Sequence, residues 1–134
     1  MNITFSLLSG TYSVARLAPD TPVPAWAFDS AGFSSITRTT DELSIVGPDS
    51  IVPEDIRAER GWHVIKLHGP FTFDAVGILS SFILPLAKSG VVIIAISTFD
   101  TDYVLVKAPQ LEQAVEALGA AGHFYQTPNR SGEI

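Results

Sequence analysis

The order of strand-like and helix-like stretches in the second half of the chain constrains the fold more than any other feature of the sequence. From Trp62 onward they follow one another as strand, helix, strand, strand, helix, strand. In the split β-α-β arrangement, this order places two helices on one face of a four-stranded antiparallel sheet. We therefore predict an α+β, ferredoxin-like βαββαβ domain over residues 62–126, followed by a flexible polar tail at 127–134.

Four stretches of the second half have strand character. Residues 62–68 alternate between two faces and end at Gly69-Pro70. Residues 91–97 form a nearly continuous β-branched apolar run, which is typical of a strand covered on both faces. Residues 103–107 and 123–125 are predicted as the last two strands.

Two helices are predicted between these strands. The apolar residues of the first recur at helical spacing, at Val76, Leu79, Ile83 and Leu86. Asp74 stands in a suitable N-cap position, and Ser89-Gly90 ends the helix. Pro85 removes one backbone hydrogen bond inside it, so a bend is expected. Pro109 opens the second helix and Gly122 closes it.

The first half consists of shorter elements. Strands are predicted at residues 3–8 and 12–17, a hairpin at 33–46, and one or two helical turns near 24–28. The pattern of residues 36–46 is similar to that of residues 96–106, which indicates that residues 1–61 are a shortened, degenerate copy of the second half. Chance similarity between two hairpins is the alternative.

Composition excludes several classes of function. The net charge is −6, with 14 acidic and 8 basic residues, and the basic residues are scattered, so a nucleic-acid partner is not expected. No cysteine is present, which excludes disulfides and thiol chemistry. The N-terminus lacks a basic signal region, and the apolar stretches are too short for a membrane span. A cytoplasmic protein is expected.

No motif indicates catalysis. The three histidines, His63, His68 and His123, are predicted on strands or strand edges. His63 and His68 point to opposite faces of one strand, so they cannot share a metal ion. The sequence has no nucleophile elbow, no glycine-rich phosphate loop and no H-E-x-x-H motif. We therefore predict no enzymatic activity, no cofactor and no metal.

Two motifs resemble those of a known family. Asp74-Ala75-Val76-Gly77-Ile78-Leu79, followed by Leu86-Ala87 and Gly90-Val91, resembles the ACT-domain signature of a D-x-x-G-I-L helix start and an A-x-x-G helix end. Residues 96–106 read ISTFDTDYVLV. This is similar to the I-S-T-[YF]-x-T-D-[YF]-x-L-V hairpin of the ACT branch that includes the eukaryotic cytosolic arginine sensors and many small bacterial proteins. The resemblance covers residues 62–124, and the first half fits it more loosely.

The resemblance implies a binding site. ACT domains bind amino acids or other small ligands, usually between two copies. This puts Asp74, Gly77 and Ile78 on one side of the site and Val92 and Ile93 of the other copy opposite them. In the arginine sensors, the aspartate that ends the S-T-x-x-x-D turn helps to hold the ligand, and it corresponds to Asp102 here. Thr98 belongs to the same turn.

Physical chemistry supports such a site independently. The N–H groups at a helix N-terminus suit a ligand carboxylate, and Gly77 allows a ligand close to the backbone. Asp100 and Asp102 can take an ammonium or guanidinium group. Structural roles explain the same residues: a cap for Asp74, close packing for Gly77, and local turn hydrogen bonds for the hairpin residues.

The function predicted from the sequence is therefore non-catalytic and regulatory. We expect an amino-acid sensor that acts allosterically as a homodimer, with the ligand held between ACT units. The alternative is a protein-interaction module that needs no small molecule.

Overall fold

The computed structural model describes residues 2–72 and 75–127, and the chain divides into two compact units. Residues 1–8 and 63–134 form the unit that we call the two-helix unit, and residues 9–62 form the hairpin unit. Asp74 and residues 128–134, which make up most of the predicted tail, lie outside the described residues. No helix in the described part of the chain is long and apolar enough to cross a membrane.

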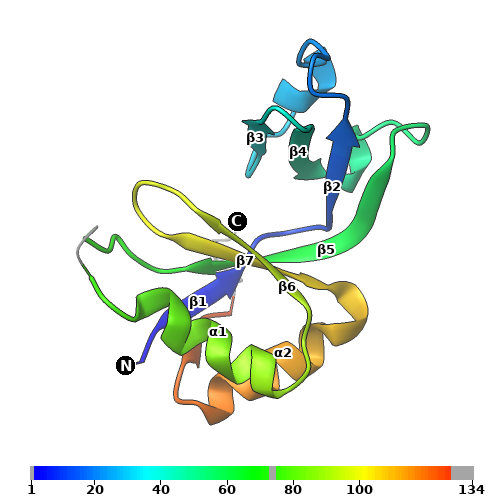
Figure 1. The fold of residues 1–134 in the computed structure, drawn as a ribbon. Helices are drawn as coiled ribbons and strands as arrows, with labels where there is room; N and C mark the ends of the chain where they lie inside the picture. Colours follow the sequence, from blue (N-terminus) through cyan, green and yellow to red (C-terminus); the bar gives the residue numbers. More distant parts are fainter. Residues whose placement is uncertain (1, 73–74, 128–134) are drawn as a thin grey trace. The chain divides into compact units, whose positions relative to one another are not determined.

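The two-helix unit combines a mixed sheet with two helices that lie side by side on one face of it (Figure 1). The helices are α1 (Ile78–Lys88) and α2 (Leu111–Ala120), the second preceded by the short η3 (Ala108–Gln110). The strands are β1 (Thr4–Leu7), β6 (Ile93–Ser97), β7 (Asp102–Lys107), β8 (Phe124–Tyr125) and the second half of β5 (Ala58–Leu67). The α+β class predicted from the sequence is confirmed.

The sheet of this unit differs from the expected four antiparallel strands. Its order is β8-β1-β5-β7-β6, with β1 antiparallel to β5 but parallel to β8. The N-terminal strand therefore belongs to the second half of the chain in space, whereas the division predicted at residues 61 and 62 assigned it to the first half. Core packing explains why β1 belongs to this sheet. Phe5 is fully buried, and its ring packs edge-on against the ring of Phe82 on α1, with the ring centroids 5.4 Å apart.

The first helix begins later than predicted. Gly77, not Asp74, is the N-cap residue of α1, and its φ of 83° lies in the left-handed region. A right-handed helix cannot continue back through such a residue, so the helix starts at Ile78. Val76 consequently lies outside the helix and is 87% exposed, while Phe82 and Leu86 of α1 are buried in the core.

The prediction that residues 91–97 form a strand covered on both faces was wrong. β6 pairs with β7 alone among the described strands and is therefore an edge of the sheet. Ile93, Ile94 and Ile96 are half-buried, and Ala95 is exposed. A run of β-branched residues favours an extended strand wherever it lies, so the run predicts the strand but not its place in the sheet.

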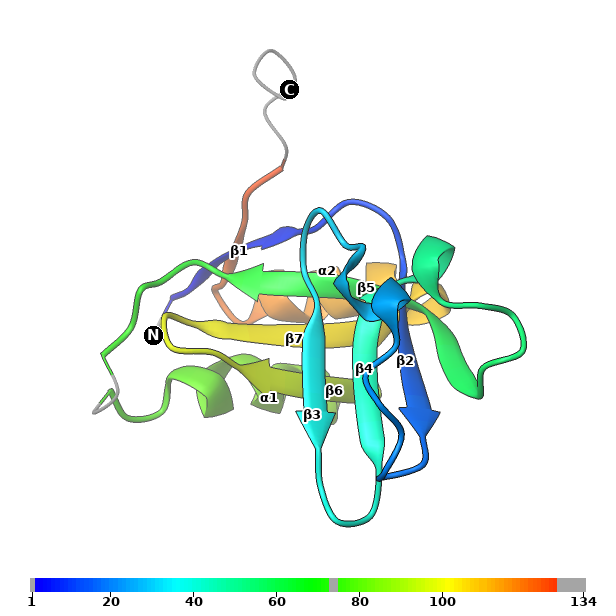
Figure 2. The same cartoon turned by 90° about the horizontal axis from the view of Figure 1, so that it is seen from above.

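The hairpin unit is a small antiparallel sheet with two short 3-10 helices. β3 (Ser35–Arg38), β4 (Leu43–Pro48) and β2 (Tyr12–Leu17) lie side by side, and β2 pairs in turn with the first half of β5 (Figure 2). The helical turns predicted near 24–28 are η1 (Ala25–Phe28), and η2 (Asp49–Ile51) follows β4. The core of the unit comprises Ala15, Ala27, Leu43, Ile45 and Val52.

Candidate functional site

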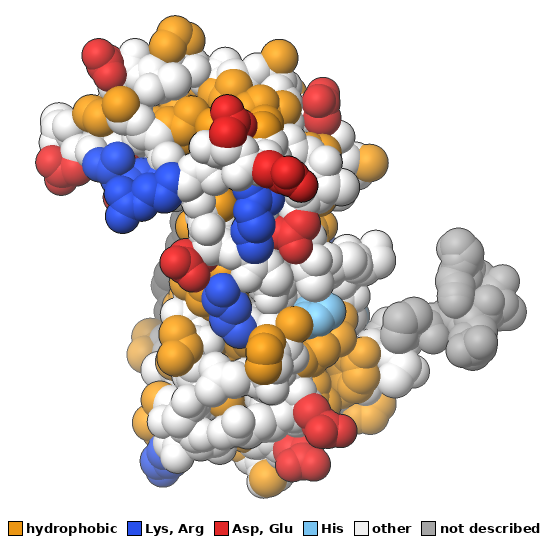
Figure 3. Space-filling model, turned by 90° about the vertical axis from the view of Figure 1, so that its right-hand side faces the viewer, with side chains coloured by type: hydrophobic (Ala, Val, Ile, Leu, Met, Phe, Trp, Pro, Cys, Tyr) orange, Lys and Arg blue, Asp and Glu red, His pale blue; other side chains and the backbone are white. Residues whose placement is uncertain are grey.

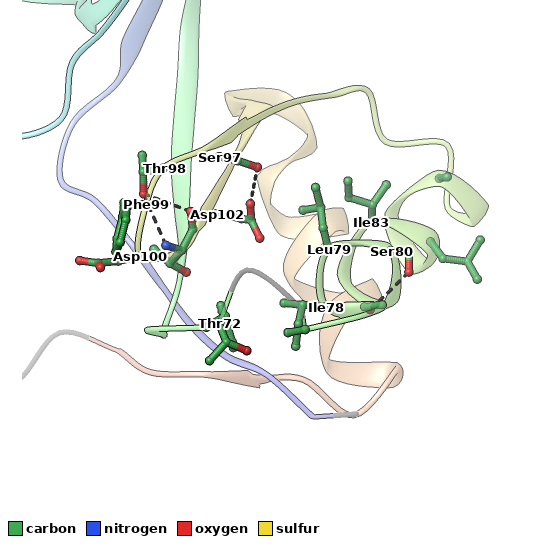
Figure 4. A pocket seen from close by; sticks show the side chains of 16 residues that line it. Thr72, Ile78, Leu79, Ser80, Ile83, Ser97, Thr98, Phe99, Asp100 and Asp102 are labelled. Carbon is green, nitrogen blue, oxygen red and sulfur yellow. Dashed lines mark hydrogen bonds between the residues drawn. The ribbon is translucent and has the colours of Figure 1, made fainter.

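A pocket of about 740 Å³ lies in the two-helix unit between the start of α1 and the β6–β7 hairpin (Figure 4). Its apolar lining consists of Phe71, Ala75, Ile78, Leu79, Ile83, Leu84, Ala87 and Phe99. Its polar side chains are Thr72, Ser80, Ser97, Thr98, Asp100, Thr101 and Asp102. This volume lies within the range of about 300–1,000 Å³ that is usual for small-molecule sites.

The hairpin side of the pocket is fixed by hydrogen bonds within its turn. The backbone N–H of Thr98 donates to the carbonyl of Thr101 at 2.9 Å, and the Thr98 hydroxyl donates to the same oxygen at 3.1 Å. The Thr101 hydroxyl donates to the carbonyl of Leu67 at 2.6 Å, which attaches the turn to the end of β5. The turn is thus held in one conformation, as a binding site requires.

The two aspartates of the hairpin have different environments. Asp102 accepts a hydrogen bond of 2.5 Å from Ser97, the residue opposite it in the β6–β7 register, and its carboxylate points toward α1 (Figure 4). The Asp100 carboxylate points away from α1, and it has no hydrogen-bond or ion-pair partner among the described residues. Asp102 is therefore the oriented carboxylate of the pocket.

The helix side of the pocket offers backbone donors. The first intrahelical bond of α1 runs from the N–H of Ser81 to the carbonyl of Gly77, at 3.0 Å. The N–H groups of residues 78–80 precede this bond, so they have no partner within the helix, and no side chain caps them from the Gly77 position. These groups carry the positive end of the helix dipole, which favours a negatively charged ligand group.

The ionisable side chains that line the pocket are acidic. Its described lining includes Asp100 and Asp102 but no Lys, Arg or His. Such a lining favours a ligand that is cationic or carries a cationic group, and the apolar wall favours a hydrocarbon portion. Across the described residues, no cluster of three His, Cys, Asp or Glu side chains is arranged to hold a metal ion.

The structure brings most of the residues predicted for the site together. Five of the eight line the pocket: Gly77, Ile78, Thr98, Asp100 and Asp102. Val92 and Ile93, which the resemblance assigns to the other copy, do not line it. The side chain of Val92 is 62% exposed, its N–H donates to Gln110 Oε1 at 3.0 Å, and Ile93 packs against the core.

Sequence reasoning did not select several lining residues. Ser97 was identifiable, because it lies opposite Asp102 once the hairpin register is known. Phe71 and Thr72 follow the strand end at Gly69-Pro70, and no periodic pattern marks residues in such a loop.

One carboxyl group with a shifted pKa lies elsewhere, in the hairpin unit. Burial alone would raise the pKa of Asp49, but hydrogen bonds from Ser13 and Thr11, the backbone N–H of Gly61 and the charge of Arg60 lower it below its ordinary value. The Thr11 hydroxyl donates to Asp49 at 2.6 Å, and Ser13 is fully buried. This cluster joins β2 to η2 and has a structural role.

Basic side chains form no extended patch on the face shown in Figure 3. Lys and Arg are interspersed with Asp and Glu there. This arrangement lacks the positive footprint that binding to a phosphate backbone requires.

Comparisons with known proteins relate part of the chain to a described family of domains. A family model described as an ACT domain matches residues 57–120, and a model described as an N-terminal domain matches residues 10–55. The crystal structure of an Agrobacterium tumefaciens protein is similar over 96% of both chains, with 44% sequence identity and a TM-score of 0.90. Comparison with curated proteins gave no significant match.

More distant structures share the fold. A Vibrio cholerae protein of unknown function, described as a possible transport protein, has 18% identity and a TM-score of 0.73 over 90% of this chain and 91% of its own. The ligand-free regulatory subunit of aspartate kinase from Thermus thermophilus has 13% identity and a TM-score of 0.64 over 89% and 98%. At these identities, the likeness concerns the fold alone.

Proposed function

We propose that this chain, whose residues 57–120 match an ACT-domain model, is a non-catalytic regulatory protein that binds an amino acid between α1 and the β6–β7 hairpin. The proposal rests on one observation: an oriented carboxylate and a helix N-terminus lie on opposite sides of the same pocket. The Asp102 carboxylate, held by Ser97, faces the start of a helix whose first N–H groups have no partner within the helix.

These two sides match the chemistry of an amino acid. The backbone donors of residues 78–80 suit its carboxylate, and Asp102 suits its ammonium group or a cationic side chain. The apolar wall accommodates its hydrocarbon portion. Aspartates at 100 and 102 disfavour an acidic amino acid and favour an apolar or basic one, including the arginine of the sensors that the hairpin motif resembles.

A regulatory role follows from where the ligand would bind. It would join the start of α1 to the hairpin turn, about twenty residues further along the chain, and these two segments carry the two halves of the site. A ligand that prefers one arrangement of these elements shifts the population toward it. Among the structural neighbours, one is described as a regulatory subunit and another as an allosteric aspartate kinase, which supports this class of function.

The proposal includes a homodimer. β6 is a sheet edge with half-buried isoleucines, and Val92 beside it is exposed. A second copy that pairs along this edge would satisfy its backbone groups and bring Val92 and Ile93 of each copy into the interface. Size-exclusion chromatography with light scattering measures the mass directly. A monomer at all concentrations would contradict this part of the proposal and leave the pocket within one chain.

A thermal-shift screen against the twenty amino acids tests ligand binding. At a concentration of about 100 times Kd, a ligand of the native state adds about 2.7 kcal/mol, which is a rise in Tm of roughly 8 °C for a chain of this size. We expect Asp102→Asn to abolish the shift. Asp41→Asn, the same change in the turn of the β3–β4 hairpin, is the matched control and should retain it.

The second candidate is a ligand-independent interaction module, favoured by exposed apolar side chains around the pocket. Phe99 is 79% exposed, and Val76 is 87% exposed. If no amino acid shifts Tm and Phe99→Ser abolishes the capture of a partner protein, the interaction module replaces the sensor. An amino-acid shift that Asp102→Asn removes excludes this replacement.

A further inference from the structure

A second, smaller pocket of about 270 Å³ lies in the two-helix unit, where the end of β5 meets the turn of the β6–β7 hairpin. It is lined by Lys66, His68, Gly69, Pro70, Asp100 and Thr101. Asp100 and Thr101 also line the larger pocket, whereas the residues from β5 and the following loop line this one alone. The turn therefore separates two hollows of different chemistry.

Opposite charges line this smaller pocket without forming an ion pair. Lys66 contributes an ammonium group and Asp100 a carboxylate, yet no ion pair joins them, and neither has another charged partner among the described residues. Both side chains are at least partly exposed. Two unmatched charges across a small hollow attract a molecule that carries the complementary pair.

Two hydrogen bonds fix the frame of the pocket. His68 Nε2 forms a hydrogen bond of 2.8 Å with the hydroxyl of Ser6 on β1, which holds the imidazole ring against the sheet. The N–H of Phe71 donates to the carbonyl of Asp100 at 2.9 Å, so the loop after β5 holds the turn in place.

Gly69 allows this close approach. A Cβ at that position would lie 2.8 Å from the Asp100 carbonyl oxygen and 2.9 Å from the Phe71 nitrogen, closer than such atoms approach in proteins. The glycine therefore lets the turn sit directly against the strand end. As a consequence, Asp100 and Lys66 line the same hollow although they lie on different elements.

We propose that this pocket binds a small zwitterion, with its ammonium group beside Asp100 and its carboxylate beside Lys66. Asp100 disfavours a purely anionic ligand such as phosphate, and Lys66 disfavours a purely cationic one. The volume is below the usual lower limit of about 300 Å³ for drug-sized ligands, so the ligand has few non-hydrogen atoms. This site shares Asp100 and Thr101 with the one in the proposed function, and it differs from that site in Lys66 and His68, which do not line the larger pocket.

NMR titration of the ¹⁵N-labelled full chain with glycine, the smallest zwitterionic amino acid, tests the proposal. We expect saturable shifts of the amide signals of Lys66, His68 and Gly69. Acetate and methylammonium, which each carry one of the two charges, should bind at least about tenfold more weakly, since each loses one charge-assisted hydrogen bond. No saturable shift at these three signals would overturn the proposal, and so would equal binding of either single-charge probe.

Substitution separates the two sites. Lys66→Met should weaken glycine binding at the Gly69 signal about tenfold, and Lys66→Arg should restore it because the cation is kept. Lys88→Met, in a residue that lines neither pocket, is the matched control. Asp102→Asn should leave the glycine shifts at Gly69 unchanged while it removes the amino-acid response of the larger pocket. Shifts confined to Gly77, Leu79 and Ser80, or binding insensitive to Lys66→Met, would refute the second site whatever the larger pocket binds.

Discussion

Ser97 donates a hydrogen bond of 2.5 Å to Asp102 across the β6–β7 hairpin, from the position directly opposite it in the register. The carboxylate at the centre of the proposed amino-acid site is thus oriented by a neighbour within the same hairpin. Ser97→Ala keeps the charge of Asp102 and removes only its orientation.

We therefore expect Ser97→Ala to weaken the binding of the amino acid that gives the largest thermal shift. The loss of one hydrogen bond corresponds to about 0.5–1.5 kcal/mol, or roughly a threefold to tenfold rise in Kd. Isothermal titration calorimetry measures the change, and Ser35→Ala, on a strand of the hairpin unit, should leave Kd unchanged. An unchanged Kd for Ser97→Ala would mean that Asp102 is not a ligand contact or needs no orientation.

Gly69→Ala should destabilise the protein and disturb both pockets. The added Cβ meets backbone atoms at 2.8 and 2.9 Å, so the strand end or the turn must move, at a cost of about 1–3 kcal/mol. Urea unfolding measures the change. The same substitution at Gly119, within α2, meets nothing within 4 Å and should stabilise the protein by about 0.5–1 kcal/mol, because alanine is the better helix former. Equal effects at the two positions would contradict the close approach at Gly69.

Asp49 should make stability depend on pH. Its pKa is lowered in the folded state, so its contribution is fully present above the unfolded-state pKa of about 3.9 and is lost as the pH falls through the folded-state pKa. Asp49→Asn should reduce the free energy of unfolding by about 1–3 kcal/mol at pH 7. The difference from the wild type should shrink toward pH 3, as measured by urea unfolding. A difference that is the same at both pH values would show that the charge of Asp49 is not stabilising.

Phe5→Ala should destabilise the two-helix unit strongly. Phe5 is fully buried between Phe82 and Tyr125, with both ring centroids at 5.4 Å, and the loss of such a ring costs about 3–5 kcal/mol. Phe124→Ala is the matched control, since Phe124 is 64% exposed on β8, and it should cost under about 1 kcal/mol. Thermal or urea unfolding compares them. If Phe5→Ala were as mild as the control, β1 would not be part of this core.

The elements that depend on neighbouring residues were predictable from the sequence. β2 occupies residues 12–17 as predicted, and the order of elements after Trp62 is as predicted, because alternation and helical spacing are local signals. Gly77, Thr98 and Asp102 line one pocket, and their role in ligand binding stays a prediction. The kinship of the hairpin unit with a shortened ACT copy stays a prediction.

The features that the sequence did not indicate depend on distant parts of the chain. β1 pairs with β8, which lies more than a hundred residues away in the sequence. The register Thr4↔Phe124 is not indicated by any pattern in the residues near either strand. Whether β6 lies at an edge or in the centre is decided by the strands that pair with it, not by its own residues. The start of α1 was misplaced because an aspartate is a common cap, whereas the left-handed φ of Gly77 is a backbone property that composition does not reveal.

The position of β1 between β5 and β8 has a consequence for the order of folding. The hairpin unit is an insertion in the two-helix unit, and all its residues have been synthesised before β6, α2 or β8 exists. The hairpin unit can therefore form on the ribosome before β8, the second strand that pairs with β1, has been synthesised. The two-helix unit is complete only when β1 pairs with β8, so we expect its maturation, and with it the completion of the proposed site, to end on a long-range step.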